Sequence, residues 1–82
     1  MAKTFHLTIA RVGENIFDGD AESVTLPGAD GVFTVLANHE ALVSPLKEGE
    51  ARIKDAAGAM HTVAIHESGI AEISNNQATV LL

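Results

Sequence analysis

Turn-forming residues divide this short chain into segments in which apolar and polar side chains alternate. Gly, Pro, Asn and Asp recur roughly every 8 to 12 residues, a spacing typical of β-sandwiches and β-barrels. Near the start, Phe5, Leu7 and Ile9 share one face of an extended segment, as in a half-buried strand. The one segment of helical length, residues 38–47, contains Pro45, which would break a helix. The pattern therefore predicts an all-β fold.

About 8 to 10 short strands are expected from the segments between the turns. The main segments with strand character are residues 5–12, 14–17, 22–26, 32–36, 50–54, 62–66, 70–73 and 78–82. The cluster at residues 18–20 (Asp-Gly-Asp) is expected to separate two strands, and residues 27–31 to form an exposed loop. Gly58 and the Asn75-Asn76 pair are expected to turn two hairpins. The pattern leaves the strand order open.

Two apolar segments are expected to take different places in the sheets. Residues 32–36 are apolar at almost every position, which predicts a central strand that is covered on both sides. Residues 41–46 contain Pro45, which sheets tolerate only on an edge or at a strand end, so this segment is expected to be irregular or an edge. Both segments offer apolar surface that a partner protein could cover.

The composition argues against several classes of protein. The absence of cysteine excludes disulfides, thiolate catalysis and cysteine-based metal sites. A formal net charge of -6 repels the nucleic-acid backbone. No apolar run approaches the ~20 residues that a membrane-spanning helix needs, so direct membrane insertion is not expected. We predict one soluble, cytoplasmic domain over residues 1–82.

Candidate catalytic and metal-binding residues are few and poorly spaced. The four histidines His6, His39, His61 and His66 could bind a metal, but His61 and His66 would face opposite sides of one strand, and no metal or other cofactor is expected. The acidic residues Asp18, Asp20 and Glu22 lack the remaining ligands of a calcium loop and are expected to form a solvated turn. His39, Glu40 and Ser44 lack the surroundings of a nucleophile. No catalytic residue is predicted.

A collinear series of short motifs resembles the epsilon subunit of F-type ATP synthase, which is called delta in mitochondria. The motifs extend over almost the whole chain: Phe5-His6-Leu7, Ile16-Phe17-Asp18-Gly19, Glu22-Ser23-Val24-Thr25-Leu26-Pro27-Gly28, Gly31-Val32-Phe33-Thr34-Val35-Leu36, Asn38-His39-Glu40-Ala41-Leu42, Leu46-Lys47-Glu48-Gly49, Arg52-Ile53, Gly69-Ile70-Ala71-Glu72-Ile73 and Thr79-Val80-Leu81. The resemblance implies a β-sandwich of two antiparallel sheets.

The resemblance also implies a function without chemistry of its own. The family's subunit belongs to the central stalk at the cytoplasmic face of the membrane, where it joins the gamma subunit to the ring of c subunits and helps to couple proton flow to ATP synthesis. By position, the residues expected to face gamma are Arg11, Asn38, His39, Glu40, Ala41 and Leu42. Those expected to face the c-ring are Pro27, Gly28, Ala29, Asp30, Gly31 and Val32.

The chain departs from the family's usual pattern at several positions. The family usually has Gly-His-Ala-Pro-Leu at residues 38–42, a Gly-Gly pair at residues 68–69, and often an acidic residue where this chain has Val32. Most members continue into a helical hairpin that this sequence lacks, so neither an inhibitory arm nor a nucleotide site is expected. The rival hypotheses are an unrelated β-sandwich that binds a peptide or small ligand through an exposed edge and a small hydrolase that uses His39 and Glu40.

Overall fold

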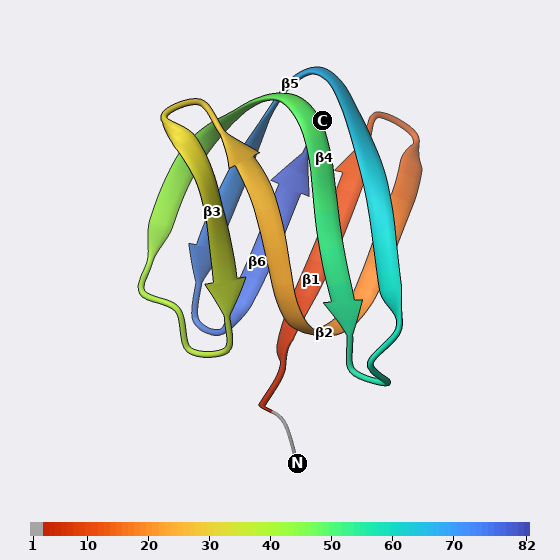
Figure 1. The fold of residues 1–82 in the computed structure, drawn as a ribbon, viewed down its shortest axis with the longest axis vertical. Coiled ribbons are helices and arrows are strands. Elements are labelled where there is room, and N and C mark those ends of the chain that lie inside the picture. Colours follow the sequence, from red (N-terminus) through yellow and green to blue (C-terminus); the bar gives the residue numbers. More distant parts are fainter. Residues whose placement is uncertain (1–2) are drawn as a thin grey trace.

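The computed structural model describes residues 3–82, and every regular element in this range is a β-strand (Figure 1). The strands are β1 (Phe5–Arg11), β2 (Glu14–Gly28), β3 (Gly31–Leu36), β4 (Leu42–Asp55), β5 (Met60–Ser74) and β6 (Gln77–Leu81). The predicted all-β fold is confirmed. None of the described residues forms a helix long and apolar enough to cross a bilayer.

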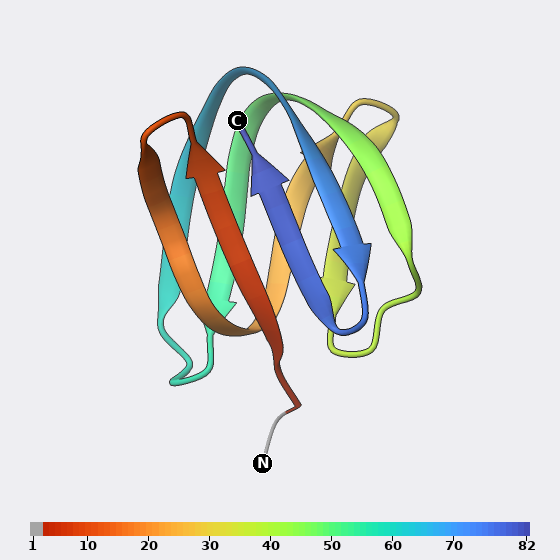
Figure 2. The same ribbon diagram turned by 180° about the vertical axis from the view of Figure 1, so that it is seen from behind.

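The strands form one six-stranded sheet that curls round on itself, with the order β1-β6-β5-β4-β2-β3 and a further pairing of β1 with β2. Figures 1 and 2 show the two layers that result, seen from opposite sides. All pairings are antiparallel except that of β1 with β6, which is parallel. A purely antiparallel arrangement was expected. The parallel pair arises because the last hairpin returns β6 beside β1 in the same direction.

Three of the six strands are long and bend, so the strands are fewer and longer than the eight to ten short segments expected. The register of β4 against β5 shifts between Lys47 and Gly49, and that of β2 against β4 shifts between Ala21 and Ser23. Such bulges bend a strand, which lets β2, β4 and β5 pass from one layer to the other. Each long strand therefore supplies two of the shorter segments.

The expected turn at residues 18–20 is wrong, because these residues stay extended within β2. Asp18, Gly19 and Asp20 pair with residues 6–8 of β1. Local composition favoured a turn there, but the ladder with β1 satisfies the backbone groups and keeps these three residues extended. The two predicted hairpins are confirmed, and Asn75 and Asn76 turn the second with φ of 51° and 58°, as a two-residue primed turn requires.

The core lies between the two layers and is apolar throughout. Its buried side chains come from alternate strand positions: Phe5, Leu7, Ile9, Ala21, Val24, Leu26, Val35, Leu46, Ala51, Ile53, Ile65, Ala71, Ile73, Ala78 and Val80. The predicted inward face of the first strand is confirmed by Phe5, Leu7 and Ile9, which are at most 3% exposed. The sandwich is therefore held together by aliphatic packing with few aromatic rings.

The position predicted for residues 32–36 is wrong, because β3 lies at the open edge of the sheet. It pairs only with β2, and its side chains are buried mainly at Val35. Val32 and Leu36 are 70% and 56% exposed. The two-residue turn after β2 places β3 beside that strand, and no other strand in the described part of the chain pairs with its outer side. The edge predicted at residues 41–46 is confirmed for residues 42–45, which pair with β5 alone, whereas Leu46 also pairs with Gly28 of β2.

Candidate interaction surface

The residues expected to face the c-ring form the β2–β3 hairpin at one end of the molecule (Figure 1). The expected exposed loop is shorter than predicted, because Pro27 and Gly28 belong to β2 and are buried. Ala29 and Asp30 form the turn, and with Gly31 and Val32 they are the exposed part of this set. We call these four residues the hairpin tip. The tip is fixed to the body by the Ala29 N–H, which donates to the carbonyl of Pro45 at 2.9 Å.

Gly28 is required by the close approach of the two arms of the hairpin. A Cβ atom at this position would lie 2.6 Å from the carbonyl oxygen of Gly31 and 2.9 Å from the ring of Phe33. Pro27 packs against the bend of β4, where a Cβ on Gly49 would lie 3.0 Å from the proline ring. Buried Pro27 and Gly28 thus set the position of the tip and do not themselves present a surface to a partner.

The residues expected to face gamma are not brought together. Residues 38–42 connect β3 to β4 at the end of the molecule opposite to the hairpin tip, whereas Arg11 ends β1 at the same end as the tip (Figures 1 and 2). The molecule is 35 Å long. A single interface that includes Arg11 and residues 38–42 would have to extend along one side of the sandwich.

The segment of residues 38–42 is held by hydrogen bonds to the last hairpin. The Asn38 N–H donates to Oδ1 of Asn76 at 2.7 Å, and Nδ2 of Asn76 donates to the carbonyl of Thr4 at 3.0 Å. Asn38 has a φ of 62°, a left-handed conformation that asparagine tolerates better than most other side chains. This accounts for asparagine at a position where the family usually has glycine. Glu40 and Ala41 are exposed, and Leu42 packs partly against the core.

The contacts of His39 and Ser44 do not resemble those of a catalytic pair. Nδ1 of His39 lies 2.6 Å from the carbonyl of its neighbour Glu40, and the Ser44 hydroxyl donates to the carbonyl of Pro45 at 3.1 Å. Both side chains are therefore engaged with nearby backbone. Glu40 is exposed and, within residues 3–82, takes part in no ion pair. This geometry gives no support to the hydrolase hypothesis.

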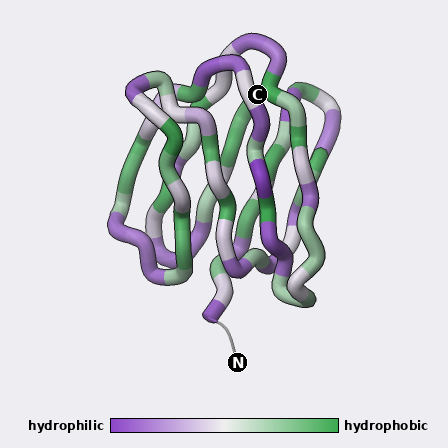
Figure 3. The backbone as a smooth tube through the Cα atoms, in the orientation of Figure 1, coloured by the Kyte–Doolittle hydropathy of each residue, from purple (hydrophilic) through white to green (hydrophobic). Residues whose placement is uncertain are grey.

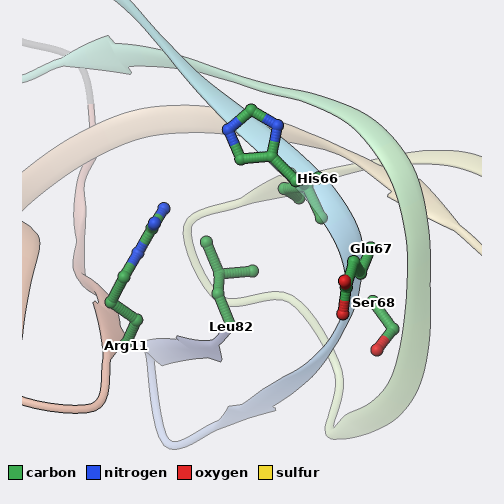
Figure 4. Close-up of a pocket in the computed structure, with 6 residues that line it drawn as sticks. Arg11, His66, Glu67, Ser68 and Leu82 are labelled. Carbon is green, nitrogen blue, oxygen red and sulfur yellow. The ribbon is translucent and has the colours of Figure 1, made fainter.

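Arg11 borders a shallow depression of about 190 Å³ (Figure 4). Ile65, His66, Glu67, Ser68 and Leu82 line the rest of it. Figure 4 shows the Leu82 side chain between Arg11 and the bend of β5, which carries His66, Glu67 and Ser68. Leu82 is fixed there by its N–H, which donates to the carbonyl of Ala10 at 2.9 Å. The depression is open and suits contact with a protein surface better than binding of a small molecule.

An ion-pair cluster around His6 was missed by the sequence analysis. Nε2 of His6 lies 2.6 Å from Oδ1 of Asp18, and Nδ1 lies 3.4 Å from Oδ1 of Asp20. Hydrogen bonding to Asp18, and then to Asp20, raises the pKa of His6 above 6.5. Oε1 of Glu22, the third acidic residue of the predicted solvated turn, lies 3.8 Å from Nζ of Lys54 in β4. The pairing of β1 with β2 brings His6 beside Asp18 and Asp20, which no sequence spacing indicated.

A second exposed pair joins the two arms of the β4–β5 hairpin. Nε2 of His61 lies 2.7 Å from Oδ2 of Asp55, and the ring of His61 packs edge-on against Phe17. The hydrogen bond from His61, followed by those from the backbone of Ala59 and Ala57, lowers the pKa of Asp55. Among residues 3–82, no three His, Asp or Glu side chains are close enough to hold a metal ion. Each of the two histidine–aspartate pairs links neighbouring strands, His6–Asp18 joining β1 to β2 and His61–Asp55 joining β5 to β4.

The His6 pair is expected to give a small stability difference between acid and alkaline pH. Because the folded pKa of His6 is raised, its contribution is complete below the unfolded pKa near 6.5 and is lost as the pH rises through the folded value. We expect His6→Asn to lower Tm by a few degrees at about pH 5.5 and by less at about pH 8.5.

His66→Asn provides the control, because His66 takes part in none of the ion pairs of the described residues. Thermal unfolding followed by circular dichroism at both pH values gives the comparison. A loss of Tm in His6→Asn that is the same at both pH values would contradict the role given to the charged pair.

Comparison with known proteins identifies the family. The sequence profile described as "ATP synthase, Delta/Epsilon chain, beta-sandwich domain" matches residues 4–82. The chain belongs to this family. It is 36% identical over 81 residues to the ATP synthase epsilon chain of Caulobacter vibrioides, with 99% of this chain and 91% of that protein covered. It is 42% identical over 79 residues to the epsilon chain of Campylobacter fetus, with 96% of this chain and 60% of that protein covered.

The chain spans about three fifths of the length of several other epsilon chains, such as the 58% that it covers of the Herminiimonas arsenicoxydans protein. Among solved structures, it superposes with a TM-score of 0.87 on a chain of the Euglena gracilis mitochondrial ATP synthase, at 24% identity, covering 95% of this chain and 49% of that one. A chain of the Tetrahymena thermophila central stalk and c-ring gives a TM-score of 0.75 at 14% identity. These two likenesses concern the fold.

Proposed function

We propose that this epsilon-type domain is a non-catalytic part of the central stalk of an F-type ATP synthase, where it joins the gamma subunit to the c-ring. The observation that carries the proposal is the family match over residues 4–82. In this role the chain would act as one domain over residues 1–82, at the cytoplasmic face of the membrane, and would bind neither a nucleotide nor any other cofactor. Because the chain belongs to this family, the rival hypothesis of an unrelated β-sandwich is rejected.

The shape of the domain suits a connecting part. The hairpin tip and the segment of residues 38–42 lie at opposite ends of a molecule 35 Å long. Between them, the closed sheet and its aliphatic core resist bending, since packed interiors have low compressibility. We propose that the tip contacts the c-ring and that residues 38–42 contact gamma. Arg11, with the depression beside it, would contribute to a gamma interface only if that interface extends along the side.

Co-purification with a cognate gamma subunit tests the proposed function. The chain and gamma, expressed together, are expected to elute from size exclusion as a one-to-one complex. The replacement Glu40→Arg reverses the charge of an exposed residue in the proposed interface and should weaken the complex by about fivefold or more. The exposed Ala57→Arg, in the β4–β5 turn, should leave the complex intact. Separate elution of well-folded partners would contradict the proposal.

The hairpin tip provides a second test, in the assembled enzyme. Ala29→Trp adds a large side chain at an exposed turn position and is expected to lower ATP-driven proton pumping by about fivefold or more, the effect of roughly 1 kcal/mol lost at an interface. Ala57→Trp is a matched control at an exposed position of another turn. Proton pumping in inverted membrane vesicles gives the readout. Equal pumping by the two variants would exclude the tip from the c-ring contact.

A further inference from the structure

The outer edge of β3 has backbone groups without a strand partner among the residues that the structure describes. β3 ends the strand order and pairs only with residues 23–28 of β2. The hairpin turn has two residues, so Gly28 and Gly31 close it as a hydrogen-bonded pair. Because hydrogen-bonded and non-hydrogen-bonded pairs alternate along an antiparallel ladder, Val32, Thr34 and Leu36 direct their N–H and C=O groups away from β2.

Two contacts agree with this orientation. The carbonyl of Leu36 accepts a hydrogen bond from the His39 N–H at 3.2 Å, outside the ladder with β2. The hydroxyls of Thr25 and Thr34, which pair across β2 and β3, lie 2.9 Å apart, as the closer side chains of a non-hydrogen-bonded pair allow. The free N–H groups of Val32 and Thr34 therefore face outward.

This edge lacks the features by which sheet edges usually avoid pairing with other chains. β3 contains no charged residue and no proline, whereas natural edge strands commonly carry lysine, proline or a bulge. Its exposed Val32 and Leu36 add apolar surface. Figure 3, which colours the backbone by hydropathy, shows β3 as a largely hydrophobic strand. The other partly unpaired segment, the first arm of β4, is protected by Pro45, whose carbonyl faces Ala29 and whose missing N–H leaves no donor on that side.

The charges around β3 indicate which partner it would accept. Asp30 precedes the strand and Glu40 follows it, and neither takes part in an ion pair within residues 3–82. A second copy of this chain would bring another formal charge of -6 against the first, which opposes self-pairing. We infer that the β3 edge binds an extended apolar segment of a partner protein with basic residues at both ends, which adds to the sheet as a further strand.

A synthetic peptide tests this inference without reference to the ATP synthase. The probe is Lys-Val-Thr-Val-Thr-Val-Lys with blocked ends, added to the whole 82-residue chain labelled with ¹⁵N. We expect the added peptide to change the NMR chemical shifts mainly of β3 residues and to slow amide hydrogen exchange at Val32 and Thr34. A peptide with Glu in place of both Lys residues should bind about tenfold more weakly, and added salt should narrow the difference.

Thr34→Pro and Thr34→Ala form a matched pair of variants. Both remove the hydroxyl contact with Thr25, but only proline removes the outward N–H. We expect Thr34→Ala to bind the Lys-ended peptide like the wild type and Thr34→Pro to bind about tenfold more weakly, the effect of one lost backbone hydrogen bond. A peptide N-methylated at all three valines and both threonines, which cannot pair along either edge, should fail to bind the unaltered chain and gives the same test if Thr34→Pro does not fold.

Three results would overturn the inference. The first is a peptide-induced change of NMR chemical shifts that is confined to residues outside β3. The second is equal binding of the N-methylated and unmodified peptides. The third is a dimer of the chain, seen by sedimentation and abolished in Thr34→Pro, which would assign the edge to a second copy. A failure of the chain to co-purify with gamma would leave this inference unaffected, because the peptide experiment depends only on the β3 edge.

Discussion

Replacing Leu7 with alanine is expected to lower the free energy of unfolding by about 2–5 kcal/mol. Leu7 is completely buried between the layers, in the strand that pairs with both β2 and β6. Its truncation removes apolar contacts and leaves a cavity that the surrounding strands can fill only in part, because they are fixed in two ladders. A small domain has a total stability of roughly 5–15 kcal/mol, so this loss would be a large fraction.

Urea unfolding followed by circular dichroism measures this effect. Val12→Ala is the matched control, since Val12 is fully exposed at the β1–β2 turn and its truncation should change the free energy of unfolding by less than about 0.5 kcal/mol. Similar losses in the two variants would mean that the packing of β1 against the core contributes little to stability.

Gly28→Val is expected to destabilise the domain by about 1–3 kcal/mol or more and to abolish the assembly proposed for the hairpin tip. The added side chain would collide with the carbonyl of Gly31, which is backbone and cannot rotate away, and with the ring of Phe33. The arms of the hairpin would have to separate, which displaces Ala29 and Asp30 and breaks the hydrogen bond from Ala29 to Pro45.

Ala29→Val separates the effect of position from that of added size. It introduces a similar side chain one residue further on, where the position is exposed, and should leave the free energy of unfolding within about 0.5 kcal/mol of the wild type. Urea unfolding and assembly with gamma and the c-ring would be measured for both variants. Wild-type behaviour of Gly28→Val in both assays would show that the hairpin tolerates wider separation of its arms.

The departures from the family's glycine pattern follow from the space around each residue. At residues 68–69, where the family usually has two glycines, only Gly69 is crowded: a Cβ there would lie 2.8 Å from the carbonyl of Leu81. Ser68 is exposed on the bend of β5, so a side chain is tolerated. The same reasoning explains Asn38, whose left-handed φ a non-glycine residue can adopt when it is asparagine.

The sequence by itself determined the properties that depend on near neighbours along the chain. Alternation of apolar residues fixed the inward face of β1, because successive side chains of a strand point to opposite sides. Gly58 and Asn75-Asn76 fixed two hairpins, since few other residues adopt their backbone conformations at low cost. Family motifs spread over the whole chain fixed its membership in the epsilon family.

Only the tertiary structure decided the properties that depend on pairing between distant segments. The ladder with β1 keeps residues 18–20 extended and places Asp18 and Asp20 beside His6. Within residues 3–82, no strand pairs with the outer side of β3, so an apolar strand lies at an edge although its composition resembles that of a central one. Closure of the sheet places Arg11 at the opposite end from residues 38–42. Residue patterns along the chain indicate which side of a strand is buried. Strand order determines which strands pair, and strand order depends on contacts between residues far apart in the sequence.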